Sequence, residues 1–125
     1  MIEKIEHIGI AVKDLDKANK IYEQLLGTSP YKMETVDSEE VNTSFFKTGE
    51  SKVELLQATK NESAIAKFIA KKGEGIHHIA FAVKDIHKEI KRLKETGYTI
   101  INEKPKKGAD NKLVLSLIHI SEPTR

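Results

Sequence analysis

Residues 7–17 read His-Ile-Gly-Ile-Ala-Val-Lys-Asp-Leu-Asp-Lys, and residues 78–88 read His-Ile-Ala-Phe-Ala-Val-Lys-Asp-Ile-His-Lys. The offset between the two stretches is 71 residues, and eight of seventeen positions are identical between 6–22 and 77–93. Self-similarity of this strength indicates one supersecondary unit that is used twice. If the two copies pack by pseudo-twofold symmetry, the histidines that open them can meet.

Each copy predicts a strand followed by a helix. In the first copy, Ile5–Val12 alternates with a β-branched bias, which is typical of a strand. Asp14 is a suitable N-cap for the helix that follows, and Gly27 is expected to end it. Apolar residues at helical spacing are expected to form the buried face of this helix: Leu15, Ala18, Ile21, Tyr22, Leu25 and Leu26.

The second copy repeats this order. Ile76–Val83 predicts a strand, Asp85 an N-cap and Gly97 the end of a helix. Further elements are predicted between and after the copies: a hairpin at Val41–Phe46 and Lys52–Ala58, a helix at about 63–71, and strands at Tyr98–Asn102 and Lys112–Ile118.

These elements predict a single α+β domain over residues 1–125, built from two βαβββ modules. The first module spans about 1–60, a bridging helix about 61–72, and the second module about 75–114, with its C-terminal strand incomplete. Two curved sheets side by side would leave a concave trough lined from both modules.

The amino-acid composition argues against several classes of function. The chain has 125 residues, 38% of them hydrophobic and 32% charged, with a net charge of +2 and no cysteine. The interspersed charges argue against a nucleic-acid partner or a membrane surface, and the missing cysteines exclude disulfides and thiolate chemistry. The N-terminus lacks the layout of a signal peptide, so we expect a cytoplasmic protein.

The two histidines are the main candidates for a site. His7 shares a strand face with Gly9 and Ala11, and His78 shares one with Ala80 and Ala82. Small residues beside a polar one indicate a face that borders a cavity, whereas the opposite faces are apolar and should lie beneath the helices. Two facing imidazoles favour a metal site, although each histidine could instead be a hydrogen-bonded sheet residue. His77 falls on the other strand face and is interpreted as a strand-flanking residue.

Gln57 ends an alternating apolar face on the second strand of the hairpin, after Val53 and Leu55. A carboxamide oxygen in this position can be a ligand for a hard metal, or it can cap the strand. The residue alone does not decide between these roles.

Four stretches carry a resemblance to a known family: 6–12, 53–59, 64–83 and 103–109. In this order and spacing the chain resembles the vicinal oxygen chelate superfamily and, within it, the methylmalonyl-CoA epimerases, over about residues 1–114. The resemblance implies a divalent metal ion of the cobalt, manganese, nickel or zinc type, held by His7, Gln57 and His78. It also implies an acyl-CoA substrate, epimerised by removal and return of the proton between thioester and carboxylate, and it allows a homodimer.

The chain departs from this family at both positions where a glutamate base is expected. One position holds Thr43, whose hydroxyl is not a base at neutral pH. The other glutamate, also the fourth ligand, would lie near position 128 if Gln57 is shifted by the repeat offset of 71 residues. Residues 115–125 resemble the translation of a transposase sequencing adapter, so a truncated frame with a foreign tail is expected. The catalytic residues therefore stay unassigned, and weak metal binding with little epimerase activity is expected.

Two alternatives stay open. One is another metal-dependent enzyme of the same superfamily, either a glyoxalase-like lyase or a ring-cleaving dioxygenase. The other is a small-molecule-binding protein of this fold that carries no metal. Metal content and oxygen uptake distinguish these possibilities.

Overall fold

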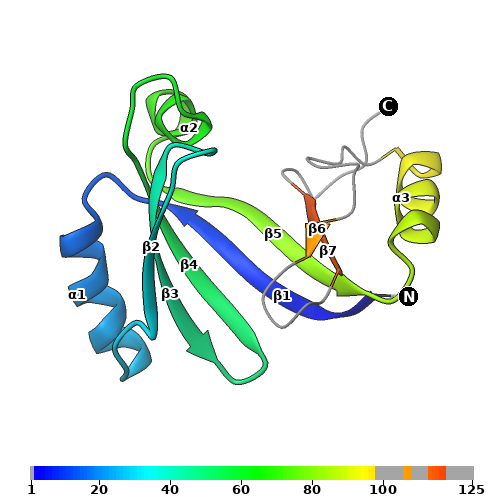
Figure 1. The fold of residues 1–125 in the computed structure, drawn as a ribbon, viewed down its shortest axis with the longest axis horizontal. Coiled ribbons are helices and arrows are strands. Elements are labelled where there is room, and N and C mark those ends of the chain that lie inside the picture. Colours follow the sequence, from blue (N-terminus) through cyan, green and yellow to red (C-terminus); the bar gives the residue numbers. More distant parts are fainter. Residues whose placement is uncertain (1, 98–105, 108–112, 118–125) are drawn as a thin grey trace. The chain divides into compact units, whose positions relative to one another are not determined.

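The computed structural model describes residues 2–97, 106–107 and 113–117, and its contacts divide the chain into two units (Figure 1). One unit comprises residues 8–77, called here the 8–77 unit. The other joins the N-terminal seven residues to the chain from His78 onwards and is called the terminal unit. The boundary runs through two strands, β1 (Ile2–Ala11) and β5 (Gly75–Val83). Each copy of the repeat therefore starts at this boundary.

The 8–77 unit has the predicted βαβββ order. After the second half of β1 come α1 (Leu15–Leu26), β2 (Lys32–Val36), β3 (Val41–Thr48) and β4 (Ser51–Ala58), and then α2 (Ala64–Lys72). The strands are arranged β2-β3-β4-β1, with antiparallel pairing of β2 to β3 and of β3 to β4. Strand β2 has no counterpart among the predicted elements, because four of its five residues are exposed and no alternation marks it.

Helix α1 packs on one face of this sheet. Its N-cap Asp14 accepts a hydrogen bond from the Lys17 backbone N–H, and Gly27 ends it in the left-handed conformation at φ 71°, as predicted. Ile21 and Leu25, which were expected to be buried, are 61% and 71% exposed, so this part of the prediction is wrong. The apolar residues of α1 extend around a wider part of the helix surface than the sheet covers. The core beneath α1 contains Ile10, Val12, Leu15, Ala18, Tyr22, Leu26, Phe46, Val53 and Leu55.

Helix α2 covers a second core in the same unit. Ser63 caps the helix by accepting a hydrogen bond from the Ala66 backbone N–H. Ala11 is fully buried in this core, so the prediction that the small-residue face of β1 borders a cavity is wrong at this position. The small side chain lets α2 approach the sheet instead. The core contains Ala11, Val36, Val41, Leu56, Ala58, Ile65, Phe68 and Ile69.

The terminal unit contains the first half of β1, the second half of β5, α3 (Ile86–Glu95), β6 (Lys106–Lys107) and β7 (Leu113–Leu117). Strand β7 pairs antiparallel with β5 and with β6, which confirms a strand within the predicted range 112–118. The predicted strand at 98–102 and the last eight positions of the chain lie outside the described residues. A core of apolar residues joins α3 to the strands: Ile2, Phe81, Val83, Ile86, Ile90 and Leu93.

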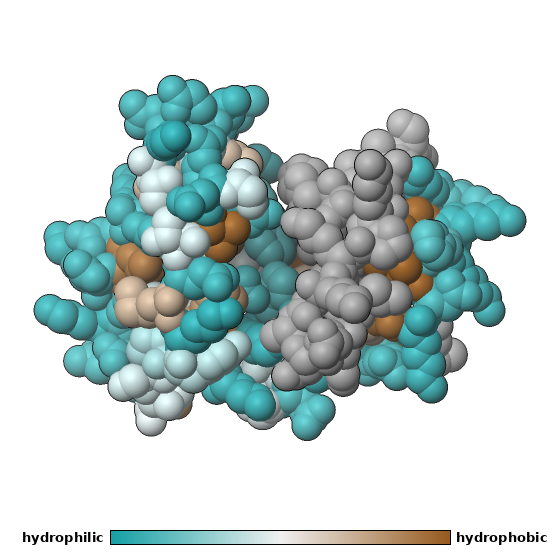
Figure 2. Space-filling view, viewed as in Figure 1, coloured by the Kyte–Doolittle hydropathy of each residue, from teal (hydrophilic) through white to brown (hydrophobic). Residues whose placement is uncertain are grey.

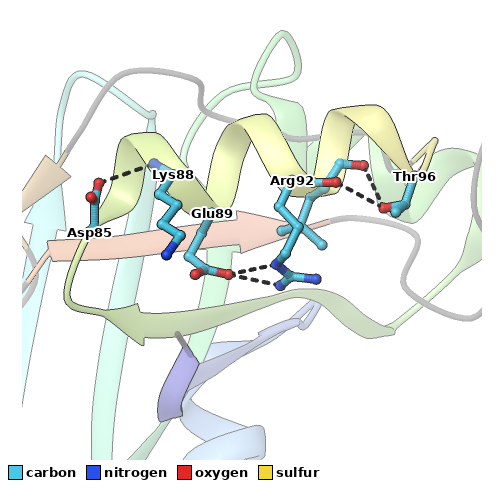
Figure 3. Close-up of polar contacts among 6 residues, drawn as sticks. Asp85, Lys88, Glu89, Arg92 and Thr96 are labelled. Atoms are coloured by element: carbon cyan, nitrogen blue, oxygen red, sulfur yellow. Dashed lines mark hydrogen bonds and ion pairs between the residues drawn. The ribbon is translucent and has the colours of Figure 1, made fainter.

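Polar contacts fix both ends of α3 (Figure 3). Asp85 accepts a hydrogen bond from the Lys88 backbone N–H at 3.0 Å, as Asp14 does for Lys17 at 3.1 Å. At the other end, the Thr96 hydroxyl donates to the backbone oxygen of Leu93 at 2.9 Å. The repeated aspartate is therefore a repeated N-cap, as the sequence predicted.

Replacing Asp85 with alanine is expected to lower the free energy of unfolding by about 1 kcal/mol, because an N–H in the first turn of α3 loses its acceptor. Urea unfolding followed by circular dichroism measures this loss. Asp85→Asn is the matched control, since asparagine also caps helices and should retain most of the stability. Equal losses in both variants would contradict a capping role.

The coloured part of the face in Figure 2 is mainly hydrophilic, with several hydrophobic areas between the hydrophilic ones. Among the helices that the structure describes, none is long and apolar enough to cross a membrane.

Candidate metal site

His7 on β1 and His78 on β5 meet in the terminal unit. Their Nε2 atoms are 3.0 Å apart, and the rings stand edge to face, with centroids 5.1 Å apart and an interplanar angle of 88°. β1 and β5 are neighbours in the sheet, so the side chains of two residues 71 positions apart in the chain come into contact. The prediction that the two histidines meet is confirmed.

The separation of the two nitrogens fits two ligands of one ion. Imidazole nitrogens that each lie about 2.0–2.1 Å from a metal are about 2.9–3.4 Å apart at ligand angles of roughly 90–110°. The observed 3.0 Å lies in this range. Without a metal, two lone pairs facing each other at this distance would repel, so one of the two Nε2 atoms must carry a proton.

The second ring nitrogen of His7 also has a partner. His7 Nδ1 lies 2.6 Å from Oε1 of Glu6, whose side chain is almost fully buried. The repeat pattern alone predicts no role for Glu6. A signal for it exists, because a carboxylate directly before the first histidine breaks the repeat, whose second copy has His77 at the equivalent position.

His77 has a different environment, in the 8–77 unit. Its ring stands edge to face with Phe68 at 5.0 Å between centroids. Burial lowers the pKa of His77 below its ordinary value, an effect that the nearby Glu39 carboxylate partly opposes. A neutral imidazole packed on an aromatic ring agrees with the interpretation of His77 as a strand-flanking residue.

Gln57 lies in the 8–77 unit, where its Oε1 accepts a hydrogen bond from the backbone N–H of Leu15 at 2.7 Å. Leu15 is the first residue of α1, so this bond satisfies one of the N–H groups that a helix start leaves without an intrahelical partner. Gln57 alternates with Leu56 and shares the α1-facing side of β4 with Leu55. The amide of Gln57 therefore caps the start of α1, a role that differs from the capping of its own strand that the sequence suggested.

Replacing Gln57 with alanine is expected to cost about 1 kcal/mol of unfolding free energy, because the Leu15 N–H loses its acceptor. Gln24→Ala, on the exposed surface of α1, is the matched control and should be nearly neutral. Co(II) titration of the same variants tests the ligand role that the resemblance implies. A loss of affinity beyond that of the control would support this role, and unchanged affinity would contradict it.

Thr43, which stands where the resemblance expects a base, is 2% exposed on β3. Its hydroxyl oxygen has no hydrogen-bond partner among the described residues. Thr43 and Gln57 line a cavity of about 420 Å³ in the 8–77 unit, together with the carboxylate residues Asp16 and Glu34. The structure thus buries Thr43, and among the described residues no group accepts a hydrogen bond from its hydroxyl.

Comparisons with known proteins agree with this architecture. The model of the Glyoxalase/Bleomycin resistance protein/Dioxygenase superfamily matches residues 6–115. The chain is 34% identical over 113 residues to the uncharacterized protein YqjC of Bacillus subtilis, covering 90% of this chain and 81% of that protein. It is 37% identical over 119 residues to the ethylmalonyl-CoA/methylmalonyl-CoA epimerase of Cereibacter sphaeroides, covering 94% and 89%.

A solved structure shares the fold. Streptomyces coelicolor methylmalonyl-CoA epimerase in complex with 2-nitronate-propionyl-CoA matches with a TM-score of 0.74 and 29% identity, covering 92% of this chain and 85% of that one. The chain spans a smaller share, 66% and 65%, of the bovine and human mitochondrial methylmalonyl-CoA epimerases that it also matches. These matches confirm the α+β vicinal oxygen chelate fold, and they show that the chain belongs to the Glyoxalase/Bleomycin resistance protein/Dioxygenase superfamily.

Proposed function

We propose that this protein is a metal-dependent epimerase of methylmalonyl-CoA, and that His7 and His78 hold its divalent ion. The observation that carries the proposal is the 3.0 Å separation of their Nε2 atoms, at equivalent positions of the repeat. The epimerases among its relatives support the substrate class, a thioester of CoA with a carboxylate on the neighbouring carbon.

The chemistry requires a weakly acidic C–H bond to be broken and remade. The proton lies between a thioester and a carboxylate, and a divalent ion, when bound, supplies the positive charge that stabilises the negative charge developing on their oxygens. His7 and His78 contribute two neutral nitrogen ligands, which leave the charge of the ion largely uncompensated. Gln57, the third ligand implied by the resemblance, is part of the proposal and is tested separately by Gln57→Ala.

Inversion at the reacting carbon also needs an acid or base on each face of the planar intermediate. Thr43 cannot fill the first of these roles, because its hydroxyl is buried and has no described partner that could remove its proton. We therefore expect proton exchange that depends on the metal but is slow.

Deuterium exchange tests the proposal. Methylmalonyl-CoA is incubated in D2O with the metal-free protein, and then with Co(II), Mn(II), Ni(II) or Zn(II), while loss of the proton is followed by NMR. The expected result is exchange above the protein-free rate that requires a metal and disappears in His7→Ala.

Three results would overturn the proposal. Exchange that persists in the presence of a chelator would show that the reaction needs no metal. Oxygen uptake with Fe(II) in place of exchange would indicate a dioxygenase. Binding of acyl-CoA without metal or exchange would indicate a binding protein of this fold.

A further inference from the structure

We propose that Glu6 is a positioning residue that holds the proton of His7 on Nδ1 and so keeps the Nε2 lone pair directed at His78 and at a bound metal ion. The inference rests on the proposed function, because it concerns the same pair of histidines. It adds a residue that touches neither the metal nor the substrate but controls one of the ligands.

The contact between Glu6 and His7 determines where the proton lies. With Glu6 as a carboxylate, its oxygens can only accept hydrogen bonds, and the nitrogen 2.6 Å from Glu6 Oε1 is then the donor. The contact is slightly shorter than the roughly 2.7–2.9 Å of N–H···O bonds to a charged group, which are themselves shorter than neutral ones. A neutral His7 therefore carries its proton on Nδ1, and its Nε2 is an acceptor.

Burial gives this contact its effect. The Glu6 residue is only 3% exposed, so little water competes for Oε1 or screens its charge. The attraction between the carboxylate and the Nδ1–H dipole of His7 is correspondingly stronger than at the surface. In known metal sites, a carboxylate that accepts from the second nitrogen of a histidine orients the ring and increases the basicity of the ligating nitrogen.

The assignment of His7 also assigns the proton between the two rings. If His7 Nε2 accepts, the 3.0 Å contact to His78 requires His78 Nε2 to donate. Only His78 must then release or relocate a proton before both Nε2 atoms can bind a metal. The second copy of the repeat has His77 where the first has Glu6, so only the first histidine directly follows a carboxylate in the sequence.

NMR of the metal-free protein tests the proton position directly. Long-range proton–nitrogen correlation spectra of histidine labelled with nitrogen-15, recorded near neutral pH, distinguish the two neutral tautomers. The wild-type protein is expected to show His7 with its proton on Nδ1. Glu6→Ala is expected to lose this preference, and Glu6→Gln, which keeps an oxygen acceptor, to retain part of it.

Co(II) affinity is the second readout. Glu6→Ala is expected to bind Co(II) about 10–100-fold more weakly, and Glu6→Gln to fall between this variant and the wild type. Glu3→Gln, on an exposed position of the same strand, is the matched control and should change neither readout. Urea unfolding of the metal-free variants separates a change in the site from a loss of structure.

Two results would overturn the role of Glu6. The first is a wild-type His7 with its proton on Nε2, or a tautomer and an affinity that Glu6→Ala leaves unchanged. The second is a Co(II) absorption spectrum of Glu6→Ala that shows a lost oxygen ligand, since Glu6 would then bind the metal itself. A wild-type protein that binds no Co(II) contradicts the proposed metal site, whereas the NMR spectra still decide where Glu6 holds the proton.

Discussion

Replacing His78 with alanine is expected to weaken Co(II) binding by at least about 100-fold and to abolish metal-dependent proton exchange. The variant removes one of two nitrogens that lie 3.0 Å apart. Changes to groups that only support a ligand typically cost about 10–100-fold in metal affinity, so loss of the ligand itself should cost at least as much. Isothermal titration calorimetry or the Co(II) absorption spectrum measures the affinity, and NMR in D2O measures the exchange.

His87→Ala is the matched control for this experiment, because His87 lies on an exposed position of α3. The double variant His7→Ala/His78→Ala adds a second criterion. If the two histidines bind one ion, the second substitution should cost much less than the first, since residues that act as a unit are strongly non-additive. Additive losses, or a His78→Ala protein with the affinity of the control, would contradict a shared ion.

Much of the fold could be predicted because the same sequence pattern, a strand followed by a capped helix, occurs in both copies of the repeat. Asp14 and Asp85 each precede an apolar stripe, and both accept the expected capping hydrogen bond. Strand β2 could not be predicted, because pairing with β3 holds it while its side chains stay exposed. Ile21 and Leu25 were wrongly expected in the core, since helical spacing alone does not show how wide a stripe the sheet will cover.

Only the part of the site whose residues occur in both copies of the repeat could be predicted from the sequence. The meeting of His7 and His78 follows from their equivalent positions, and the structure confirms it. The contact of Gln57 with the Leu15 N–H depends on how α1 packs beside β4, and no spacing in the sequence reports that. The role of Glu6 could not be predicted for a different reason. The two copies of the repeat differ at this position, so their similarity gives no information about the contact of Glu6 with His7.

The largest change in stability is expected from a substitution in the core beneath α1. Replacing Phe46 with alanine is expected to lower the free energy of unfolding by about 3–5 kcal/mol, through lost burial and the cavity that remains. Phe46 is fully buried, and its ring lies 6.3 Å from that of Tyr22 across the interface between β3 and α1. Since total stabilities are about 5–15 kcal/mol, this loss should leave much of the protein unfolded in mild denaturant.

Phe45 is the matched control, because it is the neighbouring residue on β3 and its side chain lies on the other face of the strand. Its ring is half-buried, packs 6.1 Å from Tyr31, and lies under the Lys32 ammonium at 5.1 Å. Phe45→Ala should therefore cost less than about half as much as Phe46→Ala in urea unfolding, because solvent already reaches the ring and little cavity forms. Similar losses in the two variants would mean that α1 does not cover the face of β3 that carries Phe46, and the buried core assigned to that face would be wrong.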